Sequence, residues 1–150
     1  MRLTNRFTSL LLLTVSLAAC GKGKIEQCNA FIDRASKAQA AITALNLASD
    51  DKKELEKGAT KIDAEAKAFA TVEVKDEKLV GFRTAYAQTL ESMSKIMTDL
   101  AAAQADAADA SKAEATAAKV KTLVESAEAL EKSESALVDQ INGYCSGTSK

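Results

Sequence analysis

Residues 79–100 read LVGFRTAYAQTLESMSKIMTDL, and this stretch decides the fold class. Its large apolar side chains follow one another at intervals of three and four residues, which is the spacing of one face of an α-helix. The members of this stripe are Leu79, Phe82, Tyr86, Leu90, Met93, Met97 and Leu100. The sequence therefore predicts a long amphipathic helix here, which continues into the alanine-rich residues up to about 110.

Three further segments carry apolar side chains at helical spacing. They predict one helix over about 24–48, one that follows Asp51 and includes Phe69, and one that runs from near 112 to Gly147. Short connections between such helices place chain neighbours side by side. We therefore predict an all-α fold, an antiparallel up-down-up-down four-helix bundle.

Polar residues mark the expected helix starts. Asp51 and Ser111 are each followed three residues later by a glutamate, which is the spacing of a capping box. Asp76 and Glu77 place negative charge before the helix that contains residues 79–100, where it interacts favourably with the helix dipole. The alanine-rich segment 101–118 has high helix propensity but little side chain to bury, so we expect thin packing there.

The first twenty residues have the features of an export signal. Arg2 and Arg6 precede an apolar run over about 7–17, which is roughly half the length that a membrane-spanning helix requires. The run ends in residues 17–20, Leu-Ala-Ala-Cys. This pattern predicts a secretory signal rather than a transmembrane anchor.

Residues 17–20 resemble the lipobox of bacterial lipoproteins. The resemblance implies that residues 1–19 are a cleaved signal peptide and that the mature protein begins at Cys20, which carries acyl chains such as palmitate. On this interpretation residues 20–24 form a lipidated tether, and residues 25–150 form a single helical domain.

The residue after the cysteine bears on location. In lipoproteins of bacteria with two membranes, an aspartate there tends to retain the protein at the inner membrane, so Gly21 favours the outer membrane, facing the periplasm or the cell surface. Cleavage would remove Arg2 and Arg6, so the number of basic residues would fall from 20 to 18 while the 21 acidic residues remain. The net charge of the mature chain would be -3. Membrane attachment is therefore expected from the acyl chains on Cys20 and not from charge.

Two cysteines remain once Cys20 is modified. An exported protein meets an oxidising compartment, in which leftover cysteines tend to pair. In an up-down-up-down bundle the start of the first helix and the end of the fourth lie at the same end. We therefore predict a disulfide between Cys28 and Cys145, with two buried thiols as the alternative.

Composition excludes most catalytic designs. The chain contains no His, so it cannot build a Ser-His-Asp triad, a Cys-His pair or a His-ligated zinc site. Its acidic groups lack the spacing of a calcium loop, and its charges of both signs are mixed along the chain. We expect no catalytic residue, no cofactor, no metal and no nucleic-acid partner.

Glu134 interrupts the apolar stripe of the last helix. We interpret it as a carboxylate turned to the edge of the bundle, with a buried functional carboxylate as the alternative.

The leading hypothesis for the protein is a non-catalytic, monomeric envelope lipoprotein that acts as a structural or interaction module on a protein partner. The alternative is a ligand-binding or inhibitor protein that holds a small apolar or peptidic ligand between helices. A pocket lined by large apolar side chains favours the second hypothesis, and an exposed apolar patch favours the first.

Overall fold

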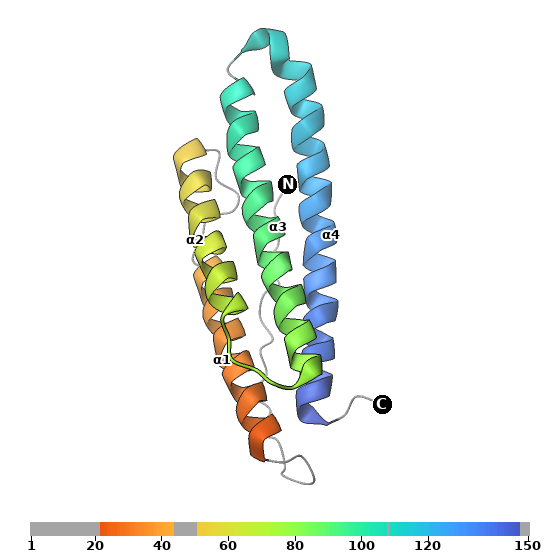
Figure 1. The fold of residues 1–150 in the computed structure, drawn as a ribbon. Coiled ribbons are helices and arrows are strands. Elements are labelled where there is room, and N and C mark those ends of the chain that lie inside the picture. Colours follow the sequence, from red (N-terminus) through yellow and green to blue (C-terminus); the bar gives the residue numbers. More distant parts are fainter. Residues whose placement is uncertain (1–21, 44–50, 108, 148–150) are drawn as a thin grey trace.

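The structure, a computed structural model, describes residues 22–43, 51–107 and 109–147, and the regular elements in these ranges are all helical (Figure 1). They are α1 (Lys22–Thr43), α2 (Lys52–Ala70), α3 (Glu77–Ala107), the short 3-10 helix η1 (Ala110–Lys112) and α4 (Ala113–Ser146). The predicted all-α class is therefore confirmed over this part of the chain.

The helix boundaries differ from the predicted ones at two places. α1 begins at Lys22, so residues 22–24, which we expected in a tether, belong to the helix. α3 ends at Ala107 rather than near residue 110, and η1 precedes α4. The predicted continuation of α1 over 44–48 lies outside the described residues.

Asp51 and Asp76 are confirmed as residues that cap helix starts, and the prediction for Ser111 is wrong. Asp51 accepts a hydrogen bond from the backbone N–H of Lys53 at 2.8 Å, and Asp76 accepts one from Leu79 at 3.1 Å. Ser111 does not cap α4. Asp109 instead caps the start of η1, because its carboxylate accepts a hydrogen bond from the backbone N–H of Ser111. The hydroxyl of Ser111 donates to the same carboxylate.

The core lies between α1, α2 and α3. Three aromatic rings, one from each of these helices, form its centre: Phe31 packs edge-on against Phe69 at 4.9 Å between centroids, and Phe69 lies 4.6 Å from Tyr86. The largest fully buried side chains are Tyr86, Phe31, Phe69, Leu55, Ile62, Leu79 and Leu90. None of them comes from α4.

α4 lies along α3, on the side opposite α2 (Figure 1). Only Thr116, Glu134 and Ile141 of this 34-residue helix are buried, and Val124 is 45% exposed. The apolar stripe that predicted α4 is otherwise half-buried. α4 therefore covers one face of α3, and it adds little to the core that the other three helices form.

Candidate functional site

One end of the structure brings together three separate parts of the chain. The first turns of α1, the connection between α2 and α3, and the last turn of α4 meet there (Figure 1). We call this the disulfide end and define it by Gln27, Cys28, Asp76, Tyr144 and Cys145.

Cys28 and Cys145 have the geometry of a disulfide. Their Cα atoms lie 5.7 Å apart, within the range that such a bond requires. Cys28 is 4% exposed within the core, and Cys145 is half-buried against it. The structure thus agrees with the predicted pairing.

Two polar side chains reinforce this junction. Oε1 of Gln27 accepts hydrogen bonds from the backbone N–H groups of Lys75 and Asp76, which fixes α1 to the α2–α3 connection. The hydroxyl of Tyr144 donates to Oδ2 of Asp76 at 2.8 Å, and this bond is the main reason that the pKa of Asp76 lies below its usual range. Nothing in the sequence distinguished Gln27, because its partners lie 48 and 49 residues away.

The ammonium groups of two lysines lie over the ring of Tyr144. Nζ of Lys24 lies 3.8 Å from the ring centroid and Nζ of Lys78 lies 5.1 Å from it, both within the range of a cation–π interaction. Phe82 contacts the same ring at 5.8 Å between centroids. Tyr144, in the last turn of α4, is therefore the centre of a cluster that contains a second aromatic ring, two ammonium groups and the carboxylate of Asp76.

The placement predicted for Glu134 at the bundle edge is wrong. The side chain is 5% exposed, and its Oε1 accepts a hydrogen bond of 3.2 Å from the hydroxyl of Tyr86. Burial raises the pKa of Glu134, and the bond from Tyr86 offsets part of this rise. Burial, followed by the charge of Glu134, also raises the pKa of Tyr86. The edge placement failed because a tyrosine from α3 meets the carboxylate, and the register of α3 against α4 is not visible in the sequence.

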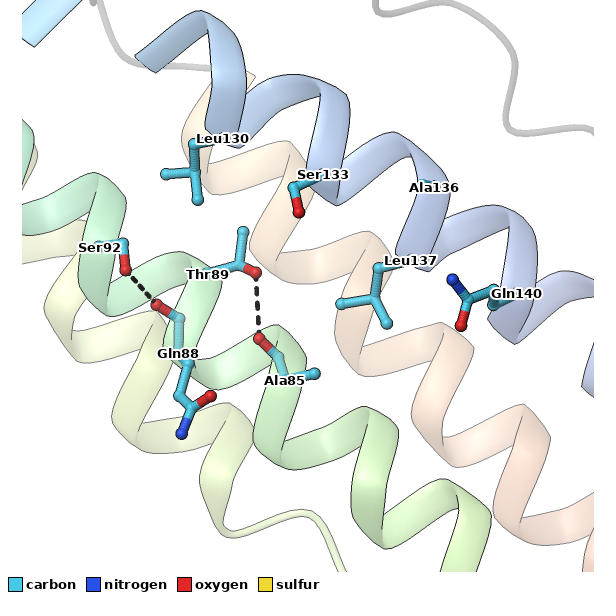
Figure 2. Close-up of a pocket in the computed structure, with 9 residues that line it drawn as sticks. All are labelled: Ala85, Gln88, Thr89, Ser92, Leu130, Ser133, Ala136, Leu137 and Gln140. Atoms are coloured by element: carbon cyan, nitrogen blue, oxygen red, sulfur yellow. Dashed lines mark hydrogen bonds between the residues drawn. The ribbon is translucent and has the colours of Figure 1, made fainter. Parts of the chain in front are cut away.

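A shallow groove of about 380 Å³ follows the seam between α3 and α4 (Figure 2). Leu130 and Leu137 are its only large apolar side chains. The hydroxyls of Thr89 and Ser92 line it but donate to carbonyls of their own helix, at 3.0 and 2.8 Å. The groove therefore offers a mixed surface in which some polar groups are already bonded.

The predicted signal peptide 1–19 and the lipobox residues 17–20, which include Cys20, lie outside the described residues. Within the described ranges, no three His, Cys, Asp or Glu side chains gather closely enough to hold a metal ion. None of the described helices is both long and apolar enough to cross a bilayer.

Comparison with known proteins assigns no relative to this chain. No protein-family model matches it, and neither the curated proteins nor the solved structures contain a significant match.

Proposed function

We propose that the protein is a lipid-anchored lipoprotein of the cell envelope, whose mature domain is a non-catalytic structural or interaction module for a protein partner. The observation that carries this proposal is the Leu-Ala-Ala-Cys run at residues 17–20, placed directly after an apolar segment of signal-peptide length. Gly21 favours the outer membrane, with the domain in the periplasm or at the cell surface. The absence of His from the whole sequence supports a role without acid–base catalysis at neutral pH.

We propose further that the four helices form an antiparallel, monomeric bundle. The disulfide between Cys28 and Cys145 supports this arrangement because it joins the start of α1 to the end of α4. The hydroxyl of Ser94, in the middle of α3, donates to the carbonyl of Ala59 in α2 at 2.8 Å, as expected for two helices joined by a short connection. We place the partner on the exposed surface of α4, a helix of which only Thr116, Glu134 and Ile141 are buried.

A ligand between the helices is the second candidate. The groove of Figure 2 favours it, because it is a concave surface that contains Leu130 and Leu137. Small and polar side chains make up the rest of its lining, whereas pockets for apolar ligands are lined mainly by large apolar groups. The lining of the groove therefore disfavours a small apolar ligand. The exposed apolar surface that would favour a protein partner is limited, among the described residues, to the large side chain of Val124.

Lipidation is tested by replacing Cys20 with Ser and growing cells with a labelled palmitate precursor. We expect the label on the native chain and none on Cys20→Ser, because only the thiol of the lipobox cysteine accepts the diacylglycerol. Cys28→Ser is the matched control: it also removes one thiol, and its labelling should remain. Label that persists in Cys20→Ser would disprove the proposal.

A further inference from the structure

The distance between the lipobox cysteine and the folded domain is short. α1 begins at Lys22, so only residue 21 separates Cys20 from the first residue of a helix. Two successive Cα–Cα steps limit the separation of Cys20 and Lys22 to roughly 7 Å. Acyl chains on Cys20 would therefore enter the bilayer next to the first turn of α1 and not at the end of a long tether.

The first turn of α1 belongs to the disulfide end. Gln27 and Cys28 link it to the start of α3 and to the last turn of α4. A bilayer that holds Cys20 must therefore lie close to this end. The opposite end, which includes Ser111 of η1, is separated from it by the length of α3, roughly 45 Å for 31 residues at 1.5 Å per residue.

The disulfide end carries side chains suited to the headgroup layer. Lys24 and Lys78 hold their ammonium groups over the ring of Tyr144, and neither lysine takes part in an ion pair within the described part of the chain. Tyrosine and lysine are typical of membrane interfaces, where the ring lies near the acyl boundary and the ammonium binds phosphate.

Acidic residues limit what these lysines can do alone. Glu26, Glu73 and Glu77 are exposed in the same parts of α1, the α2–α3 connection and α3. The carboxylate of Asp76, bonded to the hydroxyl of Tyr144, also interacts with the charge of Lys24, so this end has no basic patch. The acyl chains must therefore supply the affinity for the membrane, since two lysines beside several carboxylates attract an anionic surface only weakly. The lysines can still fix the orientation of a domain that is already anchored.

We propose that the disulfide end rests on the phospholipid headgroups, with Lys24 and Lys78 bound to lipid phosphate around Tyr144, so that the helices stand upright on the membrane. This inference rests on the proposed lipidation of Cys20. The surfaces of α3 and α4 far from the disulfide end would then face away from the bilayer, toward a partner.

Orientation can be measured by energy transfer to acceptor dyes in the headgroup layer. The full lipidated chain is placed in phosphatidylethanolamine–phosphatidylglycerol vesicles with one donor, either on Glu73→Cys near the disulfide end or on Ser111→Cys at the opposite end. With Cys20 acylated and Cys28 bonded to Cys145, the new cysteine is the one free thiol. We expect at least about two-fold more transfer from position 73, given the length of α3. Equal transfer from both positions would overturn the upright orientation.

The contribution of the lysines is tested by the pair Lys24→Glu and Lys78→Glu. We expect this double variant to lower the ratio of the two transfers by about half, because its carboxylates repel phosphate. Lys121→Glu with Lys132→Glu on the exposed surface of α4 makes the same charge change and should leave the ratio unaltered. Lys24→Arg with Lys78→Arg should preserve the native ratio and shows that charge at these positions, rather than folding, is what matters. A native ratio in the Lys24→Glu, Lys78→Glu variant would refute the phosphate contact.

Mass spectrometry of the N-terminal peptide separates the two proposals. Absence of acyl chains from Cys20 would overturn both the proposed function and this inference. Acylated protein with equal transfer from positions 73 and 111 would overturn the inference alone.

Discussion

Glu134 is a carboxylate whose environment opposes its charge. It lies on α4 among half-buried apolar side chains, and its hydrogen bond comes from the neutral hydroxyl of Tyr86. No lysine or arginine forms an ion pair with it within the described residues. Burial therefore raises its pKa, with a smaller contribution in the same direction from Glu131. A carboxylate with a raised pKa weakens the folded state at neutral pH.

Glu134→Gln should therefore stabilise the protein at pH 7. The amide removes the buried charge and can still bond to Tyr86, so we expect a gain of about 1 kcal/mol, or roughly 2–4 °C in melting temperature. As the pH falls through the raised folded-state pKa of Glu134, the native carboxyl gains a proton and the native protein regains stability. The difference in melting temperature between Glu134→Gln and the native protein should therefore shrink between pH 7 and pH 4. Thermal melts followed by circular dichroism at both pH values measure this.

Glu128→Gln is the matched control for Glu134→Gln. It makes the same substitution at an exposed position of α4 and should change the melting temperature little at either pH. A lower melting temperature for Glu134→Gln at pH 7 would show instead that the ionised carboxylate stabilises the bundle.

Glycine has different effects on stability at the end of α4 and in the interior of α3. Gly147 follows α4 in the left-handed conformation, with φ of 74°, and its backbone N–H returns to the carbonyls of Gly143 and Tyr144. Gly81 lies inside α3, is exposed, and has nothing within 4 Å of the position that a Cβ would take. Gly147 thus satisfies a steric requirement that stops α4, as the sequence predicted, whereas Gly81 only lowers the helix propensity of α3.

Alanine at these two glycine positions should therefore change stability in opposite directions. Gly81→Ala should raise the free energy of unfolding by about 0.5–1 kcal/mol, because alanine reduces the entropy of the unfolded chain and nothing obstructs its methyl group. Gly147→Ala should lower it by about 1 kcal/mol, because a Cβ is unfavourable at positive φ. Urea unfolding of the two variants measures both values. Equal effects of the same sign would contradict this assignment of roles.

The whole molecule is unevenly held together. α1, α2 and α3 share the core of large side chains, while α4 packs along α3 and buries only three residues. At its last turn, α4 is also held by the bond from Cys145 to Cys28 and by the hydrogen bond from Tyr144 to Asp76. The disulfide therefore matters more for the stability of α4 than for the stability of the other helices.

Replacing Cys28 and Cys145 by Ser should lower the melting temperature by roughly 10 °C or more. The two residues are 117 positions apart, and a disulfide closing so long a loop is worth about 4–5 kcal/mol on the chain-entropy model. Helicity should be largely retained, because the core of α1, α2 and α3 is untouched. Hydrogen exchange should increase most in α4, where few side chains are buried.

The single variant Cys28→Ser should match the double variant, since one cysteine cannot form the bond. Mass spectrometry of the purified protein under non-reducing conditions shows directly whether the bond is present. Two free, alkylatable thiols at Cys28 and Cys145 would contradict both the bond and the helix arrangement proposed from it.

The sequence alone determined the features that depend on neighbours along the chain. The apolar spacing over residues 79–100 predicted α3, Asp51 and Asp76 predicted helix starts, and Gly147 predicted the end of α4. These predictions succeed because helix periodicity, capping and the glycine stop are local properties. The pairing of Cys28 with Cys145 was also within reach, because connection length and helix order restrict which ends of a bundle can meet.

Only the tertiary structure decided which side chains meet across helices. The register of α3 against α4 places Tyr86 opposite Glu134, and it turns a predicted edge residue into a buried one. The packing of α1 on the α2–α3 connection gives Gln27 two backbone partners. Such contacts depend on how far one helix slides along another, and many registers satisfy the same apolar stripe. For this reason the helices could be predicted from the sequence, while the buried carboxylate and the cluster around Tyr144 could not.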